Sequence, residues 1–180
     1  LKRPEAEVGA LMHLFLNALD READELDANG VLIDFVGELT AIDPQLVERM
    51  HAASARTRGN AALRLNVAVN YGGRWDIVQA ARAAAAAAAS AGIDPSRIDE
   101  AMFARATCLA DQAPVDLFIR TGGETRISNF LLWQIAYAEL YFTDALWPDV
   151  DADTLAAAFA EFARRERRYG LTSAQVRATG

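Results

Sequence analysis

A short strand that ends in a Gly-Gly loop constrains this chain more than any other feature. Residues 116–130 read DLFIRTGGETRISNF, in which an apolar strand-like run, Leu117 to Ile119, is followed closely by Gly122 and Gly123. In an α/β sheet, the loop after the carboxyl end of a strand is where ligands bind, and paired glycines let a backbone approach a ligand closely. We therefore expect a ligand site at the end of this strand.

The side chains of this loop indicate the class of ligand. Arg120 and Arg126 each carry a planar guanidinium that donates to oxyanions, and Ser128 adds a hydroxyl. A pair between Arg120 and Glu124 is the alternative, but a surface ion pair is worth well under ~1 kcal/mol. Two arginines and a serine on one glycine-rich loop are explained more economically by a bound diphosphate.

Hydrophobic periodicity predicts an α/β fold along the rest of the chain. Because helices and strands alternate, we expect a mostly parallel central sheet with helices on both faces. We treat residues 1–170 as one domain and 171–180 as a mobile tail. The predicted helices cover residues 4–29, 43–59, 76–90, about 93–109, 130–138 and about 153–169, and the predicted strands cover 31–37, 63–70, 117–119 and 139–143.

Three further features leave alternatives open. The stretch 70–76, NYGGRWD, is a tight turn before a helix, a second active-site loop, or both. Glu139 follows a long apolar segment, so it needs a partner, which is either an arginine or Mg²⁺. The cluster 164–168, RRERR, suits the end of a helix, although its four arginines exceed what capping requires.

Composition excludes several classes of function. The 180 residues carry a net charge of −7 and a pI near 4.8, which argues against nucleic acid as the main partner. One cysteine, Cys108, and two separated histidines rule out a disulfide framework and a transition-metal site. The sequence has no catalytic triad pattern, no GxGxxG and no P-loop lysine. With no apolar span or signal peptide visible, we expect a cytoplasmic protein.

Several long motifs together resemble the cis-prenyltransferase family. Residues 116–140, DLFIRTGGETRISNFLLWQIAYAEL, continuing to Trp-Pro-Asp at 147–149, are similar to the family signature. Asn-Tyr-Gly-Gly-Arg at 70–74 matches a second block, Arg-Pro at 3–4 the end of a third, and Arg-Tyr-Gly at 168–170 the terminal Arg-x-Gly motif. Within the family, the sequence looks like the bacterial undecaprenyl diphosphate synthases.

The resemblance implies an activity and an apolar tunnel. Members elongate an allylic diphosphate, usually farnesyl diphosphate, by successive isopentenyl diphosphate units with new cis double bonds. The long undecaprenyl product is membrane-associated and serves cell-wall synthesis, so peripheral association with the inner membrane face is a further expectation. The tunnel would be lined by the first helix and by strand residues such as Leu63 and Leu65.

The resemblance also implies residue roles. Arg120, Arg126 and Ser128 would hold isopentenyl diphosphate, with Ile127 contributing from the loop between them, and Arg3 would contact a substrate phosphate. Glu139 would help to bind Mg²⁺, the implied cofactor. Arg168 would reach a diphosphate across the interface of a homodimer.

The chain also departs from the family pattern. The first strand, with the Asp-Gly-Asn-Gly-Arg-Trp block and the essential metal-binding aspartate, does not occur in the 180 residues. No catalytic residue can therefore be assigned, and we expect that these residues alone do not catalyse prenyl transfer. The alternatives are a non-catalytic partner subunit, a medium-chain cis-prenyl diphosphate synthase or an unrelated phosphate-binding module. The retained arginines, Ser128 and Glu139 argue against the partner subunit.

Overall fold

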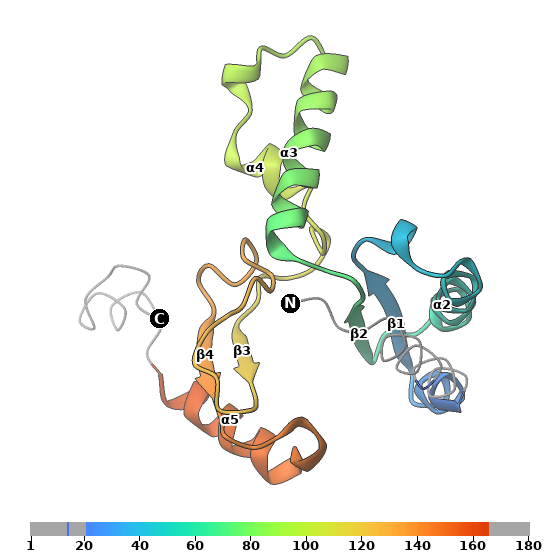
Figure 1. The fold of residues 1–180 in the computed structure, drawn as a ribbon, viewed down its shortest axis with the longest axis vertical. Coiled ribbons are helices and arrows are strands. Elements are labelled where there is room, and N and C mark those ends of the chain that lie inside the picture. Colours follow the sequence, from blue (N-terminus) through green and yellow to red (C-terminus); the bar gives the residue numbers. More distant parts are fainter. Residues whose placement is uncertain (1–13, 15–20, 166–180) are drawn as a thin grey trace. The chain divides into compact units, whose positions relative to one another are not determined.

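The computed structural model describes Leu14 and residues 21–165. The chain divides into two compact units, Leu1–Asp111 and Gln112–Gly180, each with its own pair of parallel strands (Figure 1). The α/β class and the parallel pairing of strands predicted from the sequence are thus confirmed. The described strands pair as two two-stranded sheets, one in each unit. The single domain over residues 1–170 stays a prediction.

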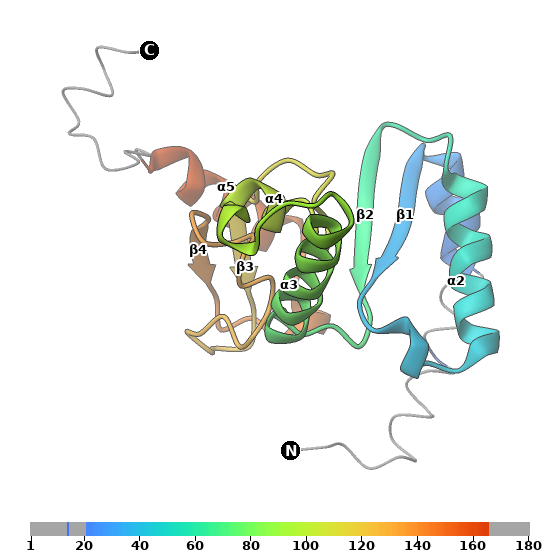
Figure 2. The same cartoon turned by 90° about the horizontal axis from the view of Figure 1, so that it is seen from above.

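The first unit is built on strands β1 (Val31–Val36) and β2 (Leu63–Ala68), whose register pairs Val31 with Leu63. Helix α2 (Pro44–Thr57) lies along β1 (Figure 2). It begins as predicted, because the Asp43 carboxylate accepts a hydrogen bond from the Gln45 N–H at 2.8 Å. The core residues of this layer are Ala23, Ile33, Phe35, Leu46, Met50, Ala53 and Val69. Their burial is the main stabilising term of the unit.

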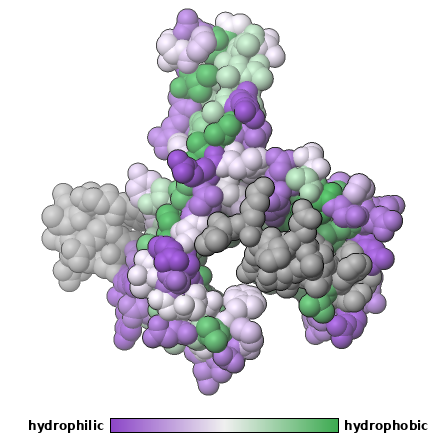
Figure 3. Space-filling model, viewed as in Figure 1, coloured by the Kyte–Doolittle hydropathy of each residue, from purple (hydrophilic) through white to green (hydrophobic). Residues whose placement is uncertain are grey.

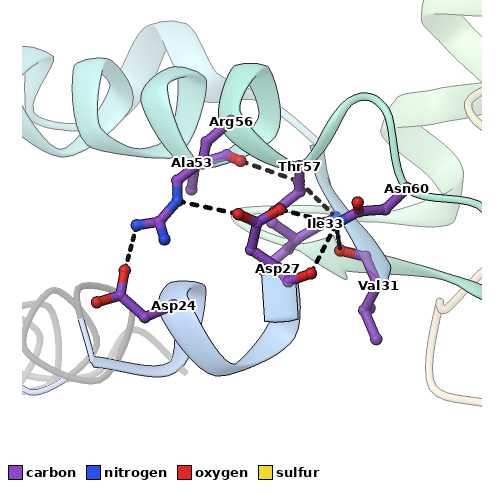
Figure 4. Close-up of polar contacts among 8 residues, drawn as sticks. All are labelled: Asp24, Asp27, Val31, Ile33, Ala53, Arg56, Thr57 and Asn60. Atoms are coloured by element: carbon purple, nitrogen blue, oxygen red, sulfur yellow. Dashed lines mark hydrogen bonds and ion pairs between the residues drawn. The ribbon is translucent and has the colours of Figure 1, made fainter. Parts of the chain in front are cut away.

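A polar network joins the end of α2 to β1 and to helical residues 21–28 (Figure 4). The fully buried Thr57 hydroxyl accepts from Ile33 N–H at 3.0 Å and donates to the Ala53 carbonyl at 2.9 Å. Asn60 Nδ2 donates to the Val31 carbonyl at 3.1 Å and to Asp27 Oδ1 at 3.0 Å. These contacts satisfy buried polar groups, which would otherwise destabilise the fold. They hold β1 in place against its helix.

Helix α3 (Gly73–Ser90) begins three residues earlier than the predicted residue 76. Its buried alanines, Ala80, Ala84 and Ala88, recur every four residues and therefore share one face. The helix contacts α4 (Glu100–Ala104) and the 3-10 turn η2 (Pro95–Arg97), and the remaining alanines give this region its pale green surface (Figure 3). The run of alanines from 83 to 89 thus lies within a regular helix, as the predicted helix over 76–90 requires.

The second unit contains β3 (Leu117–Arg120), β4 (Glu139–Phe142), the 3-10 turn η3 (Trp147–Asp149) and α5 (Ala152–Arg164). Strands β3 and β4 are parallel, with Leu117 opposite Glu139 and Arg120 opposite Phe142. A further 3-10 turn, η1 (Leu39–Ala41), follows β1 in the first unit. No helix among the described residues combines the length and apolar character needed to cross a membrane.

Three helix predictions were wrong. Residues 130–138 form turns instead of a helix, because Ser128, Asn129 and Leu131 all take positive φ, which breaks a right-handed helix at its start. The helix predicted over 93–109 is reduced to η2 and the short α4. Helix α5 ends at Arg164, since Arg165 is extended. The predicted start at Pro4 and the tail from 171 lie outside the described residues.

Candidate anion-binding site

Arg120 is the last residue of strand β3 and precedes a Gly-Gly loop. Backbone hydrogen bonds join this loop to the segment after β4. Gly122 N–H donates to the Ala145 carbonyl at 2.8 Å, and Gly123 N–H donates to the Thr143 carbonyl at 3.0 Å. Both glycines take positive φ, and a Cβ on Gly123 would lie only 3.1 Å from Asp144 Oδ1. Glycine is therefore needed here to let the loop close.

The loop brings together the three polar side chains predicted to hold a diphosphate. Arg120 Nη1 donates to Ser128 Oγ at 2.7 Å, and Arg126 Nε donates to the same oxygen at 3.1 Å. Arg120 Nη1 also donates to the Arg126 carbonyl. Ser128 sits at φ 44, a left-handed conformation that turns its hydroxyl toward both guanidinium groups. We call these three residues the Arg-Ser cradle.

The number of hydrogen bonds that each side chain can donate or accept determines which ligands suit the cradle. A hydroxyl has two acceptor lone pairs and one proton, and in this arrangement both lone pairs of Ser128 Oγ face guanidinium donors. The Ser128 proton must therefore point to a third acceptor. With the remaining N–H groups of the two arginines, the cradle is a set of donors suited to an oxyanion.

Glu124 is the acidic partner within this loop. Its carboxylate forms an ion pair with Arg126, not with Arg120 as the alternative interpretation of the sequence had it. Glu124 and Arg126 are two residues apart, and the loop curves between them, so their side chains can meet. Both side chains are substantially exposed, at 65% for Arg126 and 44% for Glu124. Solvent screens the pair, so an incoming anion can replace the carboxylate.

An apolar pocket of about 410 Å³ adjoins the cradle. Arg120, Ile127 and Ser128 line it together with apolar side chains, which include Leu117, Ile119, Phe130, Leu131, Ile135 and Trp147. Phe118 also lines the pocket, and its ring packs 6.4 Å from the Phe130 ring and 6.4 Å from the Phe142 ring, measured between centroids. A ligand with a charged head and an apolar tail matches this combination.

Glu139 lies at the opposite end of the strand pair. It opens β4 beside Leu117, whereas Arg120 lies beside Phe142, which places the two backbones about 10 Å apart along the strands. Its carboxylate bonds to Arg165 Nη1 at 2.9 Å, and this hydrogen bond raises the pKa of the Arg165 guanidinium. The arginine alternative for Glu139 is thus the arrangement observed.

The described residues do not by themselves form a magnesium site. Among them, no three His, Cys, Asp or Glu side chains are grouped as potential ligands of an ion. Mg²⁺ prefers one or two carboxylates together with phosphate oxygens and water, but Glu139 is occupied by Arg165 and stands apart from the cradle. The role of Glu139 as a metal ligand stays a prediction.

The second Gly-Gly loop, in the first unit, is held by several side-chain hydrogen bonds. Asn70, at φ 48, donates from Nδ2 to the Glu38 carbonyl at 3.0 Å, and Trp75 Nε1 donates to Glu38 Oε2 at 2.6 Å. The buried Asp76 carboxylate accepts from Tyr71 OH at 2.7 Å and from Cys108 N–H at 2.9 Å. The loop is thus a tight turn that leads into α3, and its part as a second active-site loop stays a prediction.

Several functional predictions are not addressed by these contacts. Arg3 and Arg168 lie outside the described residues. Leu63 and Leu65, expected to line a tunnel, are 61% and 38% exposed. Sequence reasoning missed Asp76 as an anchor and Arg165 as the partner of Glu139. The acidic residue in the first turn after Gly-Gly was a signal for the former, while nothing in the sequence distinguished Arg165 from its neighbours.

The fold and the cradle define an α/β protein in which two arginines and a serine meet beside an apolar pocket at the end of a strand. Comparisons with known proteins place it more narrowly. A family described as "Putative undecaprenyl diphosphate synthase" matches residues 1–170. The chain therefore belongs to the undecaprenyl diphosphate synthase family of prenyltransferases.

Individual relatives agree with the family match. A farnesyl-diphosphate-specific ditrans,polycis-undecaprenyl-diphosphate synthase of Xanthomonas axonopodis is 53% identical over 97% of this chain and 68% of its own length. The Escherichia coli K12 enzyme of the same description is 52% identical over 94% of this chain and 67% of its own.

Solved structures give the same result for the fold. A probable undecaprenyl diphosphate synthase of Campylobacter jejuni has a TM-score of 0.81 at 30% identity, covering 93% of this chain and 76% of that one. Lavandulyl diphosphate synthase of Lavandula x intermedia, in complex with dimethylallyl diphosphate, has a TM-score of 0.88 at 33% identity, covering 94% and 73%. The cis-prenyltransferase fold predicted from the sequence is confirmed.

Proposed function

We propose that this protein is a cis-prenyltransferase that condenses isopentenyl diphosphate onto farnesyl diphosphate and extends the chain to undecaprenyl diphosphate. The observation that carries the proposal is the Arg-Ser cradle beside an apolar pocket, with Arg120 Nη1 2.7 Å from Ser128 Oγ. Relatives that are 52% and 53% identical carry this activity in their names. The product would serve as the lipid carrier precursor for cell-wall polysaccharide synthesis.

In this proposal the cradle binds the diphosphate of isopentenyl diphosphate. Arg120 and Arg126 neutralise its charge, and the Ser128 proton completes the set of donors. The pocket lined by Ile127 and Phe130 takes the isopentenyl group, at about 0.8 kcal/mol per buried CH₂. Held in this way, the double bond of isopentenyl diphosphate is oriented toward the allylic substrate, and orientation of this kind lowers the barrier.

Further parts of the proposal concern residues and partners beyond the cradle. Glu139 would help to hold Mg²⁺, the cofactor that would supply charge stabilisation for a diphosphate leaving group. Arg3 would contact a substrate phosphate, and Arg168 would act across a homodimer. The enzyme would work in the cytoplasm, and its product would pass to the membrane.

The test is an assay of the protein as its gene encodes it. Radiolabelled isopentenyl diphosphate, farnesyl diphosphate and Mg²⁺ are supplied, and the product length is read by thin-layer chromatography. Incorporation into a C55 product supports the proposal, and a shorter product indicates a medium-chain synthase. If no label is incorporated even though inorganic pyrophosphate binds the cradle, the protein is a phosphate-binding module and the proposed enzyme activity is wrong.

A further inference from the structure

An exposed tryptophan, Trp147, forms part of the wall of the apolar pocket. It opens the 3-10 turn η3 and is 77% exposed, yet it lines the same pocket as Arg120 and Ser128 of the Arg-Ser cradle. Full burial of an aromatic side chain removes about 150–250 Å² of surface from water, and most of that burial has not taken place here. The indole therefore has apolar surface left with which to cover a ligand in the pocket.

Backbone hydrogen bonds position this tryptophan relative to the cradle. The two glycine N–H groups of the cradle loop donate to the carbonyls of Ala145 and Thr143, at 2.8 Å and 3.0 Å, which joins the segment before η3 to that loop. Within the turn, Val150 N–H donates to the Trp147 carbonyl at 3.3 Å. A ligand therefore has mainly the two side-chain torsions of Trp147 to order, so the entropic cost of a contact with the indole is low.

The size of the pocket leaves room for the indole to turn inward. The pocket has a volume of about 410 Å³, whereas a cavity of about 150 Å³ is enough to hold benzene. An isopentenyl group has one carbon fewer than benzene, so it fills less than half of this pocket. Unfilled apolar space deprives the groups that line it of dispersion contacts. Rotation of the Trp147 side chain over the isopentenyl group would close that space.

We infer that Trp147 is a binding residue whose indole packs over the apolar group of a prenyl diphosphate, while the cradle holds the diphosphate. The inference rests on the proposed function in one respect, the assignment of the ligand as a diphosphate with an isoprenoid tail. The donors of the cradle contact the diphosphate, whereas the indole contacts only the tail. Trp147 thus sets how strongly the site prefers a prenyl diphosphate to inorganic pyrophosphate, which has no tail.

The experiment compares two ligands that share the diphosphate. Isothermal titration calorimetry of the protein as its gene encodes it, without farnesyl diphosphate, measures the Kd of isopentenyl diphosphate and that of inorganic pyrophosphate. We expect Trp147→Ala to weaken binding of isopentenyl diphosphate about three- to tenfold, the range for loss of an aromatic contact. The same variant should leave the Kd of pyrophosphate unchanged, because the cradle is intact.

Tyr137→Ala is the matched control. Tyr137 lies in the same unit and is 78% exposed, but it is not among the residues that line the pocket. The substitution removes an aromatic side chain of the same exposure without touching the pocket wall. Both affinities should therefore equal those of the wild type.

Tryptophan fluorescence gives a second readout that does not depend on a truncated side chain. Covering an exposed indole shifts its emission to shorter wavelength, because its surroundings become less polar. Isopentenyl diphosphate should cause this shift in the wild type but not in Trp147→Phe, which keeps the other two tryptophans, Trp75 and Trp133. Pyrophosphate should cause it in neither protein. If Trp147→Ala does not fold, as judged by its melting temperature, this comparison decides the question.

Several outcomes would overturn the inference. It fails if Trp147→Ala weakens both ligands equally or weakens neither, or if isopentenyl diphosphate leaves the wild-type emission unshifted. Pyrophosphate binding by the wild type tests the cradle separately. A wild type that binds both ligands, together with a Trp147→Ala variant that has no selective loss, would leave the proposed function standing and remove this inference alone. A wild type that binds neither ligand would remove both.

Discussion

Arg120 and Ser128 are eight positions apart in the sequence, yet Arg120 Nη1 lies 2.7 Å from Ser128 Oγ. The contact closes the Gly-Gly loop on itself and gives Arg126 a shared acceptor at 3.1 Å. One hydroxyl thus organises two guanidinium groups before any ligand arrives. Such preorganisation reduces the entropic cost of binding an anion.

Arg120→Gln should weaken binding of isopentenyl diphosphate about 10- to 100-fold, since a hydrogen bond to a charged group contributes about 1.5–3 kcal/mol. The change should appear as a higher KM in a steady-state assay and as weaker pyrophosphate binding by calorimetry. Arg97→Gln, at an exposed position in η2, makes the same change in charge and should have no effect. Equal losses in both variants would show that only the overall charge matters.

Replacing Ser128 by glycine should distinguish the effect of losing the hydroxyl from the effect of the strained backbone. At φ 44 glycine is unstrained, so the melting temperature of Ser128→Gly should not fall below that of Ser128→Ala. Both variants should bind pyrophosphate about tenfold more weakly, the loss expected for one charge-assisted hydrogen bond. Full affinity in the glycine variant would mean that the hydroxyl has no part in binding.

Removing the Glu124 charge should strengthen anion binding. In Glu124→Gln the Arg126 guanidinium no longer pairs with a carboxylate, and we expect pyrophosphate to bind about two- to fivefold more tightly, the range set by an exposed ion pair. Isothermal titration at two salt concentrations measures the effect. Glu48→Gln, an exposed change in α2, serves as the control and should leave affinity unaltered.

Gly37 is the position at which we expect the largest loss of stability. It takes φ 133, and a Cβ there would lie 1.9 Å from the Val69 carbonyl oxygen. Gly37→Ala should lower the free energy of unfolding by more than about 3 kcal/mol, through strain and overpacking, as measured by urea denaturation. At Gly59 an added Cβ would meet nothing within 4 Å, so Gly59→Ala should be neutral or slightly stabilising.

Cys108 should react slowly with alkylating reagents. Burial and the neighbouring Asp76 carboxylate raise the pKa of its thiol from 9.0 to about 11, so at pH 8 the thiolate is about 100-fold scarcer than in the unfolded chain. Because the pKa of the thiol is higher in the folded chain than in the unfolded one, the neutral Cys108 thiol contributes to the free energy of unfolding. This contribution is fully present below pH 9 and is lost as the pH rises through 11. Iodoacetamide labelling with and without urea gives the rate ratio, and equal rates would contradict the shift.

Local rules were sufficient where a single turn or strand decides the outcome. The helix predicted from residue 43 does begin there, at Pro44, where the Asp43 carboxylate accepts from Gln45 N–H. The alternation of Leu63, Leu65 and Val67 predicted β2. The grouping of Arg120, Arg126 and Ser128 around two glycines predicted the cradle, because residues on one short loop have few ways to avoid one another.

Those rules failed where distant segments compete. The apolar run 130–138 has helical composition, yet the positive φ of Leu131 and the packing of Ile135 into the pocket wall produce turns. Helix α4 is only five residues long, and beyond its end the Cys108 N–H donates to the Asp76 carboxylate, 32 positions away. Long-range contacts of this kind outweigh local propensity, which amounts to less than ~1 kcal/mol per residue.

The amino-acid order alone therefore determined the α/β class, the grouping of Arg120, Arg126 and Ser128 on one loop, and the family, since each depends on contiguous motifs. Only the tertiary structure decided that Glu124 pairs with Arg126 and that Arg165 holds Glu139. Charge pairing between side chains depends on how the backbone curves through space, and many pairings satisfy the same sequence. The observed pairing is the one in which neighbouring backbone carbonyls also receive hydrogen bonds.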